Sequence, residues 1–176
     1  MRIRPAVPAD AAEIAAIYAH HVRHGTASYE TVPPDAAEIG RRLARVLGHG
    51  WPWLVAEDEH GALLGYAYAT QFRDRAAYRF VCEDSIYIRS DARGQGVGKA
   101  LLAALIAACE ASGFRQMVAV IGGAEAASAA LHARLGFAEV GRLAGIGRKH
   151  GRWLDTLYMQ RSLGEGQSSP PDFEPD

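Results

Sequence analysis

The sequence predicts a single mixed α/β domain in which a central sheet is flanked by helices. Two observations carry this prediction. Apolar segments of strand length and amphipathic segments of helix length succeed one another in the order β-α-α-β-β-β-α-β-α-β-β. Residues 117–121 are continuously apolar, as expected for a strand at the centre of a sheet. With 176 residues, the chain can bury about two-thirds of its unfolded surface in one core.

The first half of the chain is expected to supply four strands and two helices. The expected strands are residues 2–7, 53–57, 63–71 and 83–89. Asp10 and Glu13 form a D-x-x-E capping signal for the first helix. Apolar residues then recur at helical spacing, and a second such run follows the loop at 25–34. A polar, arginine-bearing loop at 72–79 leads into the fourth strand.

The second half predicts two more helices and three more strands. A helix follows the glycine-rich turn and runs to about Ser112, and another covers about 125–135. The strands are expected at 117–121, about 138–144 and 153–161. The domain is predicted to comprise residues 1–163, and the Gly-, Ser-, Pro- and acid-rich residues 164–176 are expected to form a disordered tail.

Composition excludes several classes of partner. The net charge is −1, so no basic surface is expected for nucleic acid or an anionic membrane. No apolar signal region starts the chain, and no run approaches the length of a membrane span. Cys82 and Cys109 lack metal-ligand spacing, so we expect reduced thiols, no bound metal and a cytoplasmic location.

A glycine-rich turn predicts a phosphate site. The apolar strand at 85–88 leads to Arg93-Gly94-Gln95-Gly96-Val97-Gly98-Lys99, directly before a helix. Alternate glycines let backbone amides approach an anion, and the helix N-terminus adds its positive dipole end. A P-loop is excluded, because Arg93 stands where its first glycine belongs and Ala100 where its Ser or Thr belongs. A dinucleotide fingerprint fails on glycine spacing and on the missing acidic residue.

This turn resembles the R/Q-x-x-G-x-G/A pyrophosphate loop of the GNAT acyltransferases. Further segments resemble the phosphinothricin acetyltransferase subgroup, notably Leu131-His132-Ala133-Arg134-Leu135-Gly136-Phe137 and the G-x-K-x-G-x-W-x-D run from Gly147 to Asp155. The resemblance spans roughly residues 2–161. It implies the GNAT fold, acetyl-CoA as co-substrate and a homodimer. It also implies N-acetylation of a small amino-acid-like amine such as phosphinothricin, methionine sulfoximine or methionine sulfone.

The resemblance also implies which residues contact the cofactor. They are Ile86, Tyr87, Ile88, Arg93, Gly94, Gln95, Gly96, Val97, Gly98, Lys99, Glu125 and Ser128. A β-bulge near Tyr87 or Ile88 is expected to hold the thioester carbonyl. Glu125 departs from the subgroup, which has asparagine there. A carboxylate cannot donate the amide's hydrogen bond, and Ser128 could replace part of that contact.

Two residues are candidates for the chemistry. Glu83 shares a strand face with Ser85 and Tyr87 and matches the subgroup's general base, the alternative being a surface glutamate. His132 matches the subgroup's helical histidine and is either a proton carrier or a buried structural residue. The acid that protonates the departing thiolate is left unassigned. Cys82 invites a Cys-His nucleophile interpretation, but strand alternation places it opposite Glu83, in the core.

The acceptor is expected to contact Tyr29, Arg75, Tyr78 and Arg79. An arginine here could clamp a carboxylate or phosphinate, whereas the alternative is solvated arginines and a packing tyrosine. Arg148, Lys149 and His150 are expected to serve a turn or a dimer partner. Two other functions stay open: a GNAT enzyme for a polyamine, an antibiotic or a protein N-terminus, and a catalytically silent CoA-binding regulatory module.

Overall fold

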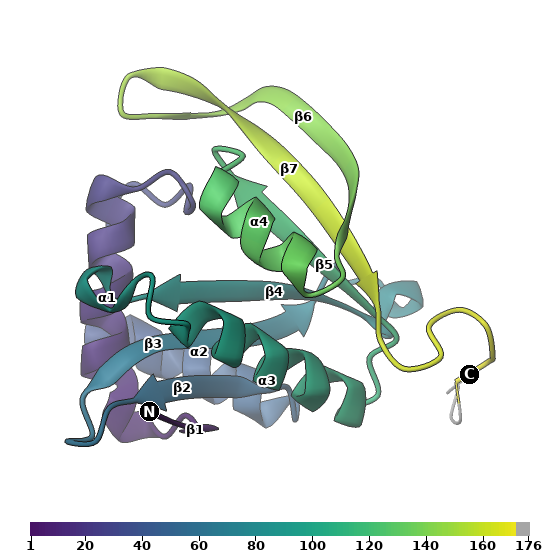
Figure 1. Cartoon of the computed structure of the whole chain (residues 1–176), viewed down its shortest axis with the longest axis horizontal. Coiled ribbons are helices and arrows are strands. Elements are labelled where there is room, and N and C mark those ends of the chain that lie inside the picture. The colour runs from purple at the N-terminus through teal and green to yellow at the C-terminus, as the bar shows by residue number, and fades with distance from the viewer. Residues whose placement is uncertain (172–176) are drawn as a thin grey trace.

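A computed structural model describes residues 1–171 of the chain. These residues form a seven-stranded sheet in the order β1-β2-β3-β4-β5-β7-β6 (Figure 1). The strands are β1 (Arg2–Pro5), β2 (Trp53–Glu57), β3 (Leu63–Gln71), β4 (Val81–Ile88), β5 (Gln116–Gly122), β6 (Ala138–Lys149) and β7 (Arg152–Ser162). The helices are α1 (Ala11–His24), α2 (Ala36–Gly48), α3 (Val97–Ala111) and α4 (Ala126–Arg134). The mixed α/β prediction is confirmed.

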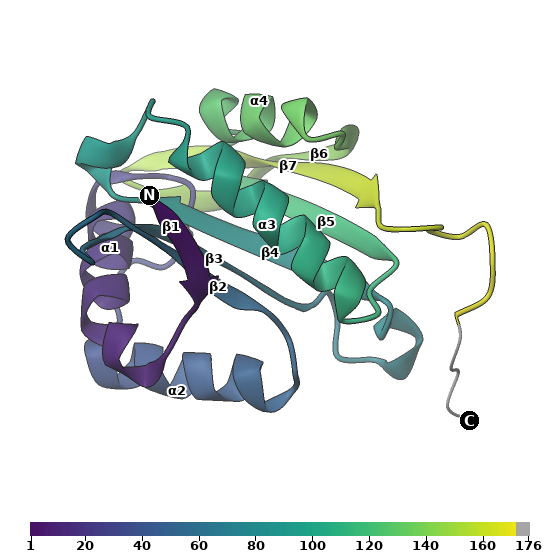
Figure 2. The same ribbon diagram turned by 60° about the horizontal axis from the view of Figure 1, so that its bottom comes forward.

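The helices cover both faces of the sheet. Helices α1 and α2 pack on one face, and α3 and α4 lie on the other (Figure 2). Each face has its own buried cluster. On the α3 side it includes Leu101, Leu105 and Met117, and on the α1 side Ile14, Leu43 and Tyr66. The two clusters hold the sheet rigidly between them, which fixes where the side chains of its central strands point.

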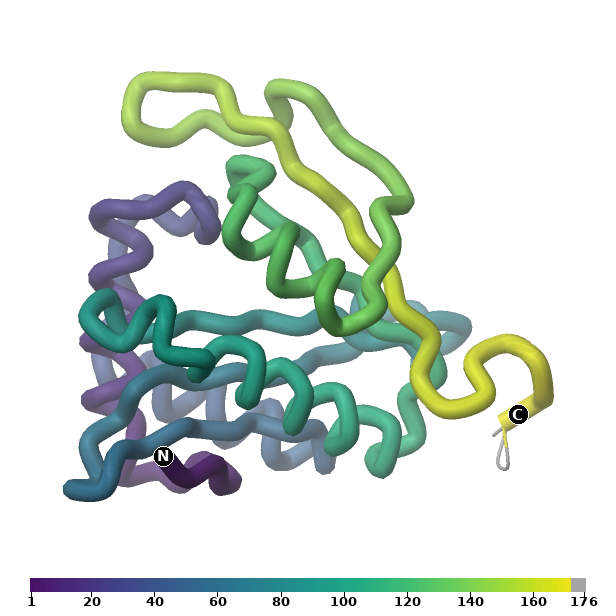
Figure 3. The backbone as a smooth tube through the Cα atoms, viewed as in Figure 1, coloured from purple at the N-terminus to yellow at the C-terminus, as the bar shows by residue number. Residues whose placement is uncertain are grey.

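The central strands β4 and β5 stop pairing half-way along their length. They pair in parallel only from Val81 beside Gln116 to Asp84 beside Ala119. Strand β4 continues to Ile88 and β5 to Gly122, and the two paths diverge toward α1 (Figure 3). On its other edge, β4 pairs with β3 in constant register from Cys82 to Ile88. The bulge expected near Tyr87 or Ile88 is therefore absent from this pairing.

The starts of α1 and α2 differ in how their capping residues are used, because tertiary contacts compete for Asp10. Asp35 caps α2 as a side-chain acceptor for the Glu38 amide. Asp10 instead binds Arg4, whose guanidinium lies 2.8 and 2.9 Å from its two oxygens, and accepts from the Val7 amide. Glu13 accepts from the Leu63 amide of β3. The D-x-x-E pair thus ties α1 to the sheet rather than closing a capping box.

The C-terminal segment begins against the domain. Leu163 is buried, and Arg115 donates to the carbonyls of Gly166 and Ser169 at 3.0 and 2.9 Å. Gly166 and Ser169 of the predicted tail therefore contact the domain, and residues 172–176 lie outside the described residues. No helix within residues 1–171 is both long and apolar enough to cross a membrane.

Candidate active site

The glycine-rich turn before α3 has a backbone geometry that suits an anion. Gly94 and Gly96 have φ of 75° and 83°, the left-handed region that glycine adopts without strain. Gly96 precedes Val97, the first residue of α3, so the first amides of the helix have no intrahelical acceptor. Arg93 and Lys99 are exposed beside them. This combination of free amides, helix dipole and two cations suits a pyrophosphate.

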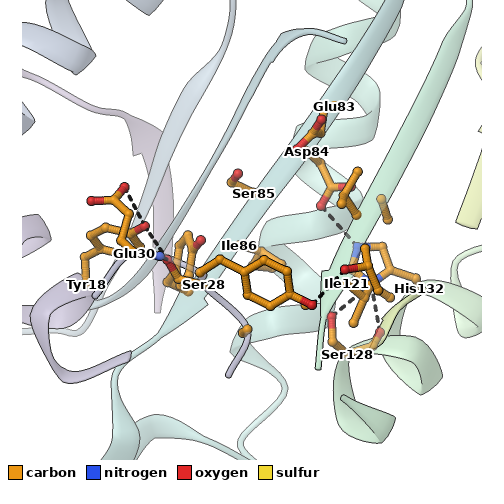
Figure 4. A pocket seen from close by; sticks show the side chains of 17 residues that line it. Tyr18, Ser28, Glu30, Glu83, Asp84, Ser85, Ile86, Ile121, Ser128 and His132 are labelled. Atoms are coloured by element: carbon orange, nitrogen blue, oxygen red, sulfur yellow. Dashed lines mark hydrogen bonds and ion pairs between the residues drawn. The ribbon is translucent and has the colours of Figure 1, made fainter. Parts of the chain in front are cut away.

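A cleft of about 420 Å³ opens where β4 and β5 diverge (Figure 4). Its lining comes from both central strands, α1, α4, β7 and the loop after α1. The lining residues are Tyr18, Ala27, Ser28, Tyr29, Glu30, Glu83, Asp84, Ser85, Ile86, Tyr87, Ala119, Val120, Ile121, Gly122, Ser128, His132 and Thr156. Because pairing with β5 stops at Asp84, residues 85–88 have no strand on that edge. On that edge the main chain of residues 85–87 is available to an extended ligand arm, whereas the Ile88 carbonyl oxygen lies 2.9 Å from Nε2 of His21.

Glu83 is half-buried in this cleft. Burial raises the pKa of its carboxyl to about 7, and the charge of neighbouring Asp84 adds to the shift while Arg73 opposes it. A base is most effective when its pKa lies near the working pH. The environment therefore converts an ordinarily weak carboxylate base into one suited to accept an amine proton.

His132 and Glu83 lie on opposite faces of β4. Asp84 follows Glu83, so alternation turns it toward α4, where its Oδ2 lies 3.1 Å from Nε2 of His132. The Nδ1 atom of His132 lies 2.8 Å from the Ser128 carbonyl oxygen. The His132 side chain is 2% exposed, and both ring nitrogens face acceptors.

This geometry favours the protonated form of His132. Burial by itself lowers the pKa of the ring, but the hydrogen bond and charge of Asp84, with the Ser128 carbonyl, outweigh it and raise the pKa. A histidine with two protonated nitrogens has no lone pair for base catalysis. Sequence reasoning missed Asp84. Its signal was an acidic residue on the core-facing side of an apolar strand.

The loop after α1 closes one side of the cleft, and we call residues 25–31 the acceptor loop. Tyr18 donates from its hydroxyl to Glu30 Oε1 at 2.9 Å and lies 2.7 Å from Ser28 Oγ. Burial raises the pKa of Tyr18 to about 12, which keeps it a neutral donor. Arg42 of α2 donates to the same Glu30 oxygen at 2.7 Å. Tyr29, which we predicted to contact the acceptor, lines the cleft.

The other predicted acceptor residues lie outside the cleft. Arg75 and Tyr78 line a separate shallow depression with Arg73 and Asp74. Arg79 donates to the Ala76 carbonyl and lines a third hollow. Their proposed contact with an acceptor stays a prediction.

Some of the residues predicted to contact the cofactor line the cleft, and others lie outside it. Ile86, Tyr87 and Ser128 line the cleft, whereas Glu125 is exposed at the start of α4. Gly98 packs closely, since a Cβ there would lie 3.3 Å from Leu131 Cδ2. Gln95 donates to the Asp91 carbonyl and so closes the turn. Within residues 1–171, no three His, Cys, Asp or Glu side chains are grouped to hold a metal.

Cys82 is fully buried on the face away from Glu83, which confirms the core placement. The adjacent Cys109 thiol and burial hold the pKa of Cys82 far above its ordinary value. A nucleophile must be available as thiolate, so the Cys-His interpretation is wrong for this chain.

Comparison with known proteins decides the family. The model of the acetyltransferase (GNAT) domain matches residues 3–158. The chain belongs to the GNAT acetyltransferase family. It is 55% identical to a phosphinothricin N-acetyltransferase of Alcaligenes faecalis, over 93% of this chain and 83% of that protein. It is 42% identical to an L-methionine sulfoximine/L-methionine sulfone acetyltransferase of Pseudomonas paraeruginosa, over 96% and 98% of the respective chains.

A solved structure shows the same fold. The GNAT superfamily phosphinothricin acetyltransferase from Sinorhizobium meliloti, in complex with AcCoA, superposes with a TM-score of 0.95 at 54% identity. The match covers 97% of this chain and 92% of that one. The chain is thus an acetyl-CoA-dependent N-acetyltransferase with the GNAT fold.

The raised pKa of Glu83 predicts how Glu83→Gln changes stability. A carboxyl with a raised folded-state pKa favours folding fully below its ordinary pKa of about 4.5, and this contribution is lost as pH rises through about 7. Glutamine resembles the protonated form. Glu83→Gln should therefore melt at a higher temperature than the parent at pH 8 and at the same temperature at pH 4.5, measured by calorimetry. The exposed Glu59→Gln should show no such pH-dependent difference.

The buried Asp84–His132 pair predicts a second effect. Since the pKa of His132 is raised, its stabilising contribution is fully present below about 6.5 and fades as pH rises through the folded-state value. At pH 6, Asp84→Asn should lower the free energy of unfolding by about 1.5–3 kcal/mol, the range for a hydrogen bond to a charged group. Urea titration measures this.

Asp91→Asn is the matched control, because the Asp91 side chain is 69% exposed and pairs with Arg89 at the surface. It should cost less than about 1 kcal/mol. An Asp84→Asn protein as stable as the parent at pH 6 would mean that His132 is neutral there.

Proposed function

We propose that the chain acetylates the amine of a small amino-acid-like acceptor, such as phosphinothricin, methionine sulfoximine or methionine sulfone, by direct attack in a ternary complex. The observation that carries this proposal is Glu83, whose carboxyl has a pKa of about 7 and opens on the cleft between β4 and β5. The activities named for the relatives supply the acceptor class.

The reaction proceeds as follows in this geometry. Acetyl-CoA lays its pyrophosphate on the amides before α3 and its pantetheine arm along residues 85–88. Glu83 accepts a proton from the acceptor ammonium, directly or through a water, and the free amine attacks the thioester carbonyl. The tetrahedral intermediate collapses, the C–S bond breaks, and the CoA thiolate leaves with the electron pair. The thiolate takes up one proton, and the second amine proton goes to solvent. The buried, doubly hydrogen-bonded His132 keeps Asp84 and the start of α4 in place.

The charge of the cleft favours a second acceptor class. Its lining contains the carboxylates Glu30, Glu83 and Asp84, and none of these described lining residues is a lysine or an arginine. Glu30 pairs with Arg42 and Asp84 with His132, so Glu83 is the carboxylate left to attract a purely cationic amine, and a polyamine is the competing acceptor. For an amino acid, the exposed Arg73 and Arg75 of the depression that they form with Asp74 and Tyr78 are candidate cations for its carboxylate.

A thiol-release assay distinguishes these proposals. With acetyl-CoA, we expect turnover of phosphinothricin, methionine sulfoximine and methionine sulfone, and slower or no turnover of spermidine. Glu83→Gln should lower kcat at least about 100-fold, the usual contribution of a general base, with acetyl-CoA affinity unchanged. Preference for spermidine would establish the polyamine acceptor. Acetyl-CoA binding without turnover of any amine would indicate the regulatory module.

We further propose that the enzyme works as a homodimer in the cytoplasm. The hairpin of β6 and β7 forms the edge of the sheet and exposes Val140, Leu143, Ile146 and Trp153, the last of them 65% exposed. Large apolar side chains gathered on one edge favour contact with a second copy. The free, buried thiols of Cys82 and Cys109 fit a reducing compartment.

Light scattering after gel filtration measures the oligomeric state. The parent is expected to elute as a dimer, and Ile146→Glu should shift it toward monomer by placing a charge in the apolar contact. Val7→Glu, at an exposed apolar residue that follows β1 at the opposite edge of the sheet, should leave the dimer intact. A monomeric parent would contradict the proposal.

A further inference from the structure

The last residue of β6, directly before the turn to β7, is a lysine that faces inward. Lys149 is 5% exposed, and its Nζ donates to the Ser28 carbonyl oxygen of the acceptor loop at 2.7 Å. Burial lowers the pKa of this ammonium, and the charge of Glu30 opposes the shift. A buried ammonium is costly unless it is hydrogen-bonded. The position of the Lys149 side chain therefore depends on the acceptor loop. This contact differs from the role at a turn or a dimer partner that we expected from the sequence.

The neighbouring glycine of the same motif makes room for the acceptor loop. A Cβ at Gly147 would lie 2.6 and 2.7 Å from two ring carbons of Tyr29. On the other side, a Cβ at Gly122 of β5 would lie 2.8 Å from the carbonyl oxygens of Thr26 and Ala27. At distances shorter than 3.0 Å, a Cβ at either glycine would force the neighbouring atoms to shift. The loop is thus seated between two strands that need glycine at the points of contact.

Tyr29 provides the third attachment. Its hydroxyl donates to the Asp155 carbonyl oxygen at 2.9 Å and lies 2.7 Å from Thr156 Oγ1. The turn also reaches the start of the loop, where His150 Nε2 lies 3.3 Å from the Gly25 carbonyl oxygen. The G-x-K-x-G-x-W-x-D run therefore meets the acceptor loop through its glycine, its lysine and the backbone of its aspartate.

We infer that the β6–β7 turn is a clamp that holds the acceptor loop over the cleft, with Lys149 as its main positioning residue. This inference rests on the proposed function, because the loop presents Ser28, Tyr29 and Glu30 to the acceptor. Lys149 itself does not line the cleft and acts through the Ser28 carbonyl. The clamp sets acceptor affinity and selectivity. Acetyl-CoA contacts the amides before α3 and the main chain of β4 in this proposal, neither of which belongs to the acceptor loop, so we expect its affinity to change little when the clamp is lost.

Loss of the ammonium has a defined consequence. In Lys149→Met, the apolar stem remains but the Ser28 carbonyl loses its donor. The loop then samples open positions, and the acceptor must order it on binding, which raises the acceptor KM. The hydrogen bond to a charged group corresponds to a factor of about 10–100 in affinity. Lys149→Arg keeps a cationic donor and should recover part of the affinity.

The experiment combines kinetics with amide hydrogen exchange on the full chain. Lys149→Met should raise the acceptor KM at least about tenfold, leave the acetyl-CoA KM within about twofold, and speed exchange in residues 25–31. The control is Arg148→Met, which removes an exposed cation that lies 5.4 Å from the Trp153 ring. It should leave both KM values and the exchange of residues 25–31 unchanged. If Lys149→Met does not fold, Gly147→Ala provides the same comparison through the Tyr29 contact.

The outcomes separate the clamp from the function on which it rests. Unchanged exchange in residues 25–31 would overturn the clamp, as would an equal rise in both KM values, which indicates a general structural defect. If the parent acetylates no amine at all, the proposed function fails. Faster exchange confined to the loop in Lys149→Met would then still establish the clamp.

Discussion

The whole arrangement depends on the point at which β4 and β5 stop pairing. Beyond Asp84 and Ala119 the strands diverge, and a sheet that is buried on both faces opens in its middle. The divergence leaves main-chain groups of β4 without a strand partner, and unpaired backbone groups are costly inside a protein. In the proposed complex, the pantetheine arm pairs with these groups. The same opening gives the cleft its volume and brings α1, α4 and the acceptor loop to one place.

Strand alternation at this point separates two carboxylates with different tasks. Glu83 faces the cleft on the α1 side and has no ion-pair partner within residues 1–171, and burial shifts its pKa toward neutral pH. Asp84 faces α4, where its Oδ2 lies 3.1 Å from Nε2 of His132. Because successive side chains of a strand point to opposite faces, only Glu83 of this neighbouring pair is available to a substrate. The Asp84 charge also raises the Glu83 pKa, so the structural pair assists the base through space.

Sequence patterns were sufficient where a function depends on neighbouring residues. The glycine turn, its cations and the helix behind it are contiguous, and alternation alone placed Cys82 in the core. Contacts between distant segments were not predictable. Asp84 meets His132 across 48 positions, and Lys149 meets Ser28 across 121. Asp10 has the right spacing for a helix cap, but the charged guanidinium of Arg4 competes for it more strongly than a backbone amide does. Strand β6 extends to Lys149, five residues beyond its predicted end, because pairing with β7 carries it on.

A crystal structure of the enzyme with CoA and an unreactive acceptor analogue tests the central claim most directly. The account predicts the pantetheine arm along residues 85–88, between the diverging strands, and the acceptor nitrogen within hydrogen-bond reach of Glu83, directly or through one water. The pyrophosphate should contact the amides that begin α3. An acceptor nitrogen bound on the α4 side of β4, remote from Glu83, would contradict the account, as would a pantetheine arm outside the cleft.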